Sequence, residues 1–148
     1  VLITTSGELL RKMSVRDGYA VKTAIDQGYR ICVISGGSNE GVRKRLMGLG
    51  VTDIYLGKSH KKEVLEEYMD VYDIPAEEVL YMGDDIPDIP AMRGCGMVTC
   101  PQNAVPEVKA MSDYISHFNG GEGCVRDIIQ QVLKVKGQWE NHFDAEQD

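Results

Sequence analysis

Short apolar segments of strand length alternate with longer amphipathic segments along most of this chain, and this alternation is the feature that most limits its fold. Five short apolar runs predict strands, at Ile31–Ile34, Ile54–Leu56, Val79–Met82, Met97–Thr99 and Tyr114–Ile115. Apolar residues at helical spacing predict four helices, at Tyr19–Asp26, Glu40–Leu49, Lys61–Tyr72 and Val125–Val135. Strands that alternate with helices favour an α/β fold, with a mainly parallel sheet covered by helices on both faces.

The two ends of the chain depart from this alternation. Residues Val1–Val15 have an extended pattern with turn residues at Ser6-Gly7-Glu8, which predicts a β-hairpin. Residues 138–148 are polar and have no periodicity, so we predict a loose tail. A chain of 148 residues can form one domain with its own core. We therefore expect a single domain over residues 1–148.

The composition excludes some classes of partner. A net charge of −7 argues against nucleic acid or an anionic membrane surface, although local cations could still bind a phosphorylated substrate. No apolar run approaches the ~20 residues that span a bilayer, and no signal-peptide pattern opens the sequence. The cysteines lack the paired spacing of metal ligands and predict a reducing, cytoplasmic location; they are Cys32, Cys95, Cys100 and Cys124.

The sequence YMGDDIPDIP, residues 81–90, places three carboxylates on a tight turn after a predicted strand. Asp84, Asp85 and Asp88 would repel one another unless a cation offset their charge. Carboxylate oxygens favour Mg²⁺, and such sites commonly handle phosphate. The alternative is an acidic turn that only caps the following helix, in which Pro87 suits the first turn. Because one capping carboxylate would suffice for that purpose, we favour the metal site.

Polar residues that suit phosphate follow two other predicted strands. Ser35-Gly36-Gly37 comes directly after Ile31–Ile34, and offers a hydroxyl and backbone amides to an oxyanion. A glycine and a basic cluster follow Ile54–Leu56, namely Gly57, Lys58, His60, Lys61 and Lys62. Because ligands of such sheets bind beyond the carboxyl ends of the strands, these groups are expected to converge with the acidic turn. Taken singly, the glycines could form a plain turn, Lys61 could be solvated, and His60 fits a surface neighbour better than a catalytic base.

The combination resembles the haloacid dehalogenase superfamily of aspartyl-phosphate phosphatases, whose fold is Rossmann-like. Ser35 matches its second motif, Lys61 its third, and Gly83-Asp84-Asp85-x-x-Asp88 its fourth. Four further segments are similar to the family of capless phosphatases that act on 3-deoxy-D-manno-octulosonate 8-phosphate: SVRDGYAVK, ISGG, YLGKSHK and GGEGCVRD. The similarity covers almost the whole chain, from the hairpin to the region of Lys136.

The resemblance implies a role for each site residue. Asp84 would bind Mg²⁺ directly and Asp85 would support the metal, while Lys61 and Ser35 would hold the phosphoryl group. The residues that would line the substrate site are Ser14, Val15, Arg16, Asp17, Gly18, Lys22, Gly36, Gly37, Arg45 and Lys61. The segment Gly120–Gly123, with Arg126, would help to close this site. The hairpin would pack in a homotetramer, and the hydrolase would serve lipopolysaccharide biosynthesis in the cytoplasm.

Two departures from the family pattern stand out. The family nucleophile lies in a D-x-D-G motif at the end of a central strand, just before the hairpin, and residues 1–148 contain no D-x-D. We expect that strand and its aspartate to precede Val1, and to pair between the strands that end at Ser35 and Asp84. Gly37 also stands where many relatives carry an arginine. Arg43, Lys44 or Arg45 could supply that charge instead.

Other functions remain open on the sequence alone. A phosphatase for a nine-carbon, sialic-acid-type 9-phosphate would share every core motif. A non-catalytic oligomerisation module would have no need of Lys61 and the acidic turn, and a receiver-type signalling domain would lack its phospho-acceptor.

Overall fold

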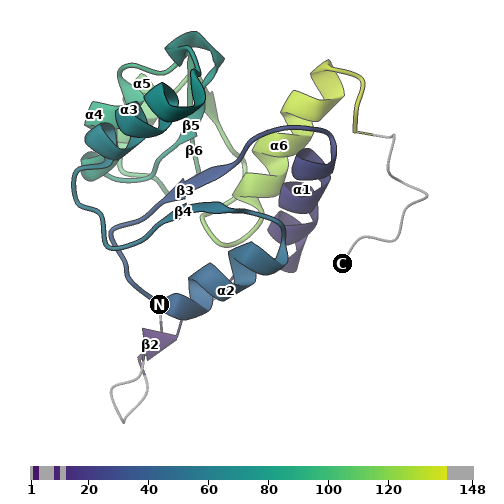
Figure 1. The fold of residues 1–148 in the computed structure, drawn as a ribbon, viewed down its shortest axis with the longest axis horizontal. Helices are drawn as coiled ribbons and strands as arrows, with labels where there is room; N and C mark the ends of the chain where they lie inside the picture. Colours follow the sequence, from purple (N-terminus) through teal and green to yellow (C-terminus); the bar gives the residue numbers. More distant parts are fainter. Residues whose placement is uncertain (1, 4–8, 11–12, 140–148) are drawn as a thin grey trace.

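The computed structural model describes residues 2–3, 9–10 and 13–139 (Figure 1). The strands are β1 (Leu2–Ile3), β2 (Leu9–Leu10), β3 (Cys32–Ile34), β4 (Asp53–Tyr55), β5 (Leu80–Met82), β6 (Met97–Cys100) and β7 (Tyr114–Ile115). The α-helices are α1 (Val15–Asp26), α2 (Glu40–Gly48), α3 (Lys61–Tyr72), α4 (Ile89–Met92), α5 (Pro106–Met111) and α6 (Cys124–Val135). Two short 3-10 helices, η1 (Ala76–Glu78) and η2 (Ile86–Asp88), flank β5.

The strands of the body are parallel, as the alternating pattern predicts, and they form two groups. β3 pairs with β4, while β5, β6 and β7 form a second sheet in that order. Within the described residues, β3 and β5 each pair on one side only. The middle strand β6 has three consecutive buried residues, whereas every residue of β3 is partly exposed. Unpaired edges of this kind leave backbone N–H and C=O groups without a strand partner.

Helices cover both sides of the strands and build two apolar cores. In Figure 1, α3, α4 and α5 lie on one side, while α1 and α6 lie together on the other. One core joins α1, α2 and the β3–β4 pair around Val21, Leu46 and Val51. The second core joins α4, α5 and β6 around Met92 and Val98. The α/β class with helices on both faces is confirmed.

The predicted strands and helices are found with bounds that mostly agree within one residue, and the largest difference is at the start of α1. The α3 helix has the predicted bounds, whereas α1 begins at Val15 rather than at Tyr19. This earlier start has a local cause, because the Ser14 side chain accepts a hydrogen bond from the Asp17 N–H and caps the helix. The helix α5 has no counterpart in the predicted pattern, since its six residues are too few to show a period.

The two ends of the chain agree only in part with the predicted hairpin and the predicted loose tail. The β1–β2 pair is antiparallel, with Leu2 opposite Leu10, which confirms the hairpin pairing. The predicted turn lies outside the described residues, and the extended segment ends before Val15. The tail is not loose from residue 138: the Tyr29 hydroxyl donates to Gln138 at 2.7 Å, and Trp139 is only 6% exposed. Among the described helices, none is both long and apolar enough to cross a membrane.

Candidate active site

The centre of the site is Asp88, a carboxylate that is 3% exposed and surrounded by donors. Its Oδ1 accepts a hydrogen bond from Lys61 Nζ at 2.8 Å and one from the Tyr81 hydroxyl at 2.9 Å. Its Oδ2 accepts the backbone N–H groups of Asp84 at 3.0 Å and Asp85 at 3.2 Å. A buried charge needs this degree of pairing to be tolerated. Asp88 therefore holds both the predicted phosphate-binding lysine and the backbone of the acidic turn.

Gly83 lets the acidic turn close tightly onto Asp88. A Cβ at position 83 would lie 2.6 Å from the Asp88 Cβ and 2.8 Å from the Met92 Sδ, closer than packed atoms approach. The Gly83 N–H also donates to the Thr99 carbonyl at 3.1 Å, which extends the β5–β6 ladder to the start of the turn. The glycine before the aspartates thus serves packing, in addition to ending the strand.

The carboxyls of Asp84 and Asp88 have opposite pKa shifts. Burial acts to raise the pKa of Asp88, but the bonds from Lys61, the Asp84 amide and Tyr81 outweigh it and hold the pKa below its usual range. Asp84 is an exposed residue whose carboxyl group is nevertheless partly enclosed by its neighbours. This local burial, followed by the charge of Asp88, raises the pKa of Asp84, although Lys61 partly offsets the effect. Asp84 is thus the carboxylate of this turn that an added cation would relieve.

The three carboxylates of the acidic turn, which were expected to need a cation to offset their charge, have different partners in the structure. Asp88 is neutralised by Lys61 rather than left for a cation. The exposed Asp85 accepts the Ile86 N–H at 2.7 Å and so caps η2. Within residues 13–139, no group of three or more His, Cys, Asp or Glu side chains is arranged to hold a metal. The described donors that fit Mg²⁺ are therefore the carboxylate oxygens of Asp84 and Asp85, and these would form only part of a coordination shell.

The loops after β3 and β4 are joined to each other by backbone hydrogen bonds. The Gly57 N–H donates to the Gly37 carbonyl at 2.8 Å, and the Lys58 N–H donates to the Ser35 carbonyl at 2.9 Å. The Ser35 Oγ accepts the Gly37 N–H at 3.1 Å. Because a hydroxyl can donate as well as accept, Ser35 still has a hydrogen for a phosphoryl oxygen. The Gly37 amide, which was expected to be available to an anion, is used within the turn.

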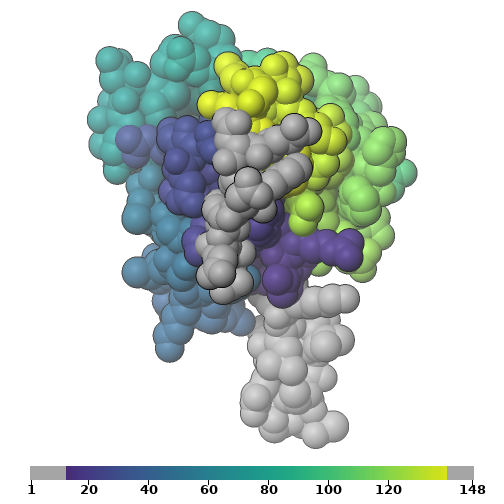
Figure 2. All heavy atoms as spheres, turned by 90° about the vertical axis from the view of Figure 1, so that its right-hand side faces the viewer, coloured from purple at the N-terminus to yellow at the C-terminus, as the bar shows by residue number. Residues whose placement is uncertain are grey.

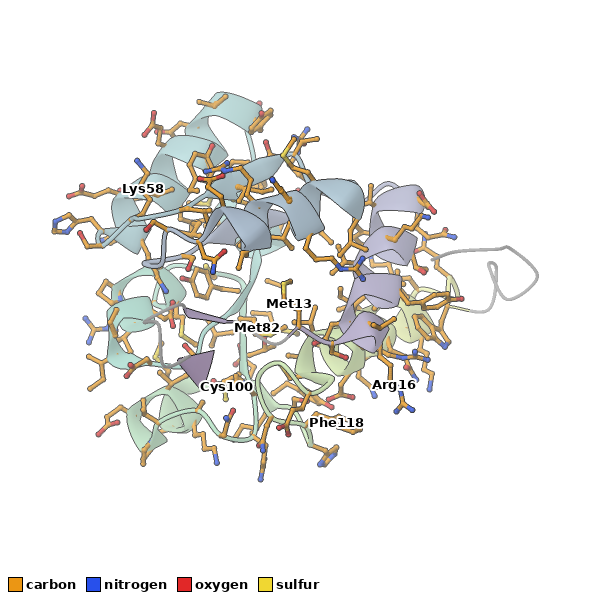
Figure 3. All side chains as sticks on the ribbon, turned by 90° about the horizontal axis from the view of Figure 1, so that it is seen from below. Met13, Arg16, Lys58, Met82, Cys100 and Phe118 are labelled. Atoms are coloured by element: carbon orange, nitrogen blue, oxygen red, sulfur yellow. The ribbon has the colours of Figure 1, made fainter. Side chains whose placement is uncertain are left out.

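The predicted substrate residues on α1 and α2 form a second region. Gly18 is buried, and a Cβ there would lie 2.8 Å from Arg45 Nη2, so the guanidinium lies directly against this glycine. Val15 is 75% exposed and Arg16 is exposed at the same end of α1, while Lys22 is half-buried further along the helix. In the view from below, Met82 lies near the middle of the molecule and Arg16 lies at the α1 side (Figure 3).

The structure thus brings together some of the predicted residues and leaves others apart. Lys61 reaches the acidic turn, and Arg45 reaches Gly18. Among the described contacts, none joins Ser35 directly to Lys61 or Asp84, and His60 is exposed, as its surface interpretation requires. Sequence reasoning missed Tyr81, whose hydroxyl contacts Asp88 across the acidic turn. Its position in a predicted strand, seven residues before an aspartate, carries no periodic signal that would reveal the bond.

Comparison with known proteins identifies the family. The family model for haloacid dehalogenase-like hydrolase matches residues 46–128, more than half of the chain. The 3-deoxy-D-manno-octulosonate 8-phosphate phosphatase of Salmonella typhi is 30% identical over 138 residues, which cover 93% of this chain and 73% of that protein. The corresponding phosphatase of Haemophilus influenzae is 31% identical over 142 residues, covering 96% and 78%.

Solved structures give the same result. The phosphatase of this name from Yersinia pestis superposes with a TM-score of 0.90 at 29% identity, covering 94% of this chain and 75% of that one. The Moraxella catarrhalis phosphatase, solved in complex with a magnesium ion, a phosphate ion and a KDO molecule, superposes with a TM-score of 0.87 at 30% identity, covering 97% and 80%. The chain therefore belongs to the family of haloacid dehalogenase-like hydrolases.

Proposed function

We propose that this protein is a Mg²⁺-dependent phosphatase that hydrolyses 3-deoxy-D-manno-octulosonate 8-phosphate to the free sugar acid and phosphate. The observation that carries the proposal is the pairing of Lys61 Nζ with Asp88 at 2.8 Å, at the acidic turn that follows β5. This pairing holds a cationic donor beside carboxylates suited to a metal, in a chain whose relatives bear that activity in their names. The enzyme class is phosphoric monoester hydrolase.

Lys61 and Ser35 are the groups that we assign to the phosphoryl oxygens. The Lys61 side chain is 16% exposed and is held by Asp88, so its ammonium needs little reorganisation to meet an anion. Ser35 offers its hydroxyl from the end of β3. A positive charge and a donor at fixed positions stabilise the negative charge that a phosphoryl group carries in the transition state.

Asp84 and Asp85 are the residues that would hold Mg²⁺, with Asp84 as the direct ligand. The raised pKa of Asp84 supports this order, because Lys61 offsets only part of the effect of local burial and of the neighbouring Asp88. When bound, Mg²⁺ would supply positive charge to the phosphoryl oxygens. Asp88 would keep its structural bonds to the turn and to Lys61.

The sugar acid would be recognised by the second region. We assign its carboxylate and hydroxyl groups to the first turn of α1 (Ser14–Gly18), to Lys22 and to Arg45, with Gly36 and Gly37 lining the loop after β3. Arg45 would supply the positive charge that position 37 lacks. Its contact with Gly18 supports this assignment, since it places a guanidinium against the exposed end of α1.

Three further expectations stay proposals. An aspartyl-phosphate route needs a nucleophilic aspartate, and residues 1–148 contain no D-x-D motif of the kind that supplies it in the family. Among the described residues, β3 and β5 each have one side without a strand partner, and a strand that carries this aspartate could pair there. Assembly as a homotetramer through the hairpin, and a cytoplasmic role in lipopolysaccharide biosynthesis, follow from the family resemblance.

The test is phosphate release from 3-deoxy-D-manno-octulosonate 8-phosphate, with and without EDTA, alongside a sialic-acid-type 9-phosphate. We expect turnover of the eight-carbon substrate that EDTA abolishes and added Mg²⁺ restores. Lys61→Ala should lower kcat/KM by about 100-fold or more. Lys62→Ala is the matched control, because the neighbouring Lys62 is 59% exposed and pairs only loosely with Glu66 at 3.8 Å.

Each outcome has a distinct meaning. Turnover that resists EDTA would contradict the metal assignment, and equal losses in the two lysine variants would contradict the role of Lys61. A preference for the nine-carbon substrate would support phosphatase activity but would identify a sialic-acid-type 9-phosphate as the substrate. If phosphate were released from neither substrate, the proposed phosphatase activity would be contradicted, and the alternative of a non-catalytic module would be favoured.

A further inference from the structure

The first turn of α6 is capped by a side chain from another helix. The residue at its N-cap position is Gly123, which has a φ of 112° and no side chain to accept a hydrogen bond. The Arg126 N–H, in the first turn, donates instead to Asp17 Oδ1 at 2.9 Å. A helix normally satisfies this N–H with its own N-cap side chain. Here α1 supplies the acceptor, from 109 residues away in the sequence.

The contact between α1 and α6 continues beyond this bond. The Arg126 guanidinium lies over the rings of Tyr19 and Trp139, with its carbon 5.6 Å and 5.5 Å from their centres. The two rings meet edge to face at 6.3 Å. The helices lie side by side in Figure 1, and the start of α1 and the yellow α6 occupy the same face in Figure 2. The N-terminal part of α1 is therefore in contact with the start of α6, through Asp17, and with Trp139, four residues after the end of α6.

The start of α6 also lies against the carboxyl end of β5. Cys124 Sγ is 4.0 Å from the Sδ of Met82, two residues before Asp84. On the other side, the Gly120 N–H donates to Asn103 Oδ1 at 3.0 Å. The turn Gly120–Gly123 thus runs from a contact with the loop after β6 to the start of α6, which touches both α1 and the end of β5.

The turn Gly120–Gly123 is rich in glycine, which makes it costly to order. Gly121 and Gly123 both have positive φ, at 73° and 112°, and glycines lose more backbone entropy on ordering than other residues. We propose that Asp17 is a positioning residue of the active site: its carboxylate caps α6 and thereby holds the Gly120–Gly123 turn beside the bound sugar acid. The positioning role rests on the proposed function, whereas the hydrogen bond by which Asp17 caps α6 does not depend on it. Within the turn Ser14–Gly18 that we assign to the sugar, Asp17 would then differ from its neighbours, because its Oδ1 holds the helix α6 and not the substrate.

Amide hydrogen exchange tests the cap directly. In Asp17→Ala, exchange at the Arg126 N–H should become about tenfold faster, because a charged cap is lost. In Asp17→Asn, whose amide oxygen can still accept the bond, exchange should stay close to that of the wild type. Asp26→Ala is the matched control, since it removes an exposed carboxylate at the far end of α1. Unchanged Arg126 exchange in Asp17→Ala would overturn the proposal, as would an equal acceleration throughout the protein.

Steady-state kinetics test the positioning role. Asp17→Ala should raise KM for the eight-carbon sugar phosphate by about tenfold, and should raise KM for p-nitrophenyl phosphate, which has no sugar to orient, by clearly less. Asp17→Asn should restore most of the KM. A faster Arg126 exchange with an unaltered KM would reduce Asp17 to a structural cap and overturn its positioning role. If the wild type hydrolysed neither compound, the proposed function would fail, and the exchange data would still decide the cap.

Discussion

The acidic turn after β5 and the first turn of α1 carry most of the predicted site residues, yet they are stabilised in opposite ways. Asp88 is buried and accepts four hydrogen bonds, from two amides of the turn, from Tyr81 and from Lys61, so the acidic turn is fixed around one buried acceptor. The first turn of α1 instead has exposed residues at Val15 and Arg16, and is fixed by Asp17 to another helix. The comparison suggests that the region assigned to phosphate is preorganised, while the region assigned to the sugar is held by a few long-range contacts.

The largest loss of stability should come from replacing Asp88, the buried acceptor of the acidic turn. Asp88→Ala leaves Lys61 and two backbone amides without their acceptor, and breaking a buried ion pair in this way costs about 3–5 kcal/mol. We expect the free energy of unfolding in urea to fall by that amount, together with loss of phosphatase activity. Asp85→Ala, which removes one exposed capping bond, should cost only about 1 kcal/mol. Equal losses of stability in the two variants would show that the buried Asp88 contributes no more than the exposed capping residue Asp85.

A smaller effect should follow from removing one donor of Asp88. Tyr81→Phe deletes the hydroxyl that lies 2.9 Å from Oδ1, and a hydrogen bond to a charged group contributes about 1.5–3 kcal/mol. Tyr72→Phe is the control, because its hydroxyl meets Asp53 at 3.3 Å in an exposed position. Unfolding in urea should separate the two variants clearly. If Tyr72→Phe proved the more costly, the four donors of Asp88 would not act as one buried network.

The sequence predicts the parts of these regions that depend on local pattern. Alternating apolar segments are enough to place the loops after β3, β4 and β5, and Lys61 begins α3 as predicted. The start of α1 was predicted four residues late, at Tyr19, because the apolar spacing begins there, whereas the Ser14 side chain caps the helix before Val15. The bond between Asp17 and Arg126 was not predicted, because a contact across 109 residues leaves no periodic trace. The burial of Trp139 was missed for the same reason, in a segment whose composition alone indicated a tail.

Asp84 and Asp88, at the two ends of the acidic turn, should also contribute to stability with opposite dependence on pH. The raised pKa of Asp84 means that its contribution to stability is full below its ordinary value of 3.8 and is lost as the pH rises through its folded pKa. The lowered pKa of Asp88 means that its contribution is present above 3.8 and is lost as the pH falls through its folded pKa. In EDTA at pH 7, Asp84→Asn should therefore be slightly more stable than the wild type, by less than about 1 kcal/mol. At pH 3 the difference should vanish.

Urea unfolding at pH 3, 5 and 7 measures both contributions of the acidic turn. Added Mg²⁺ should raise the stability of the wild type at pH 7, because a ligand that binds only the folded state stabilises it, and this gain should be lost in Asp84→Asn. If Asp84→Asn were the less stable protein in EDTA at pH 7, Asp84 would have a stabilising partner, and its assignment as the uncompensated carboxylate would be wrong.

The smallest effect on stability, with a measurable effect on binding, should come from Gly18→Ala. The new methyl would meet Arg45 Nη2 at 2.8 Å and Leu49 Cδ2 at 3.2 Å, so the flexible guanidinium must move. The helix gains from losing a glycine by about 0.5–1 kcal/mol, which should offset the tight contact with Leu49 and leave the net stability almost unchanged. KM for the sugar phosphate should nevertheless rise severalfold, because Arg45 is displaced. Gly48→Ala is the matched control, since nothing lies within 4 Å of its Cβ and the variant should gain stability with an unaltered KM. An unaltered KM in Gly18→Ala would show that the first turn of α1 does not depend on Arg45, and that the sugar region is more self-contained than its contacts suggest.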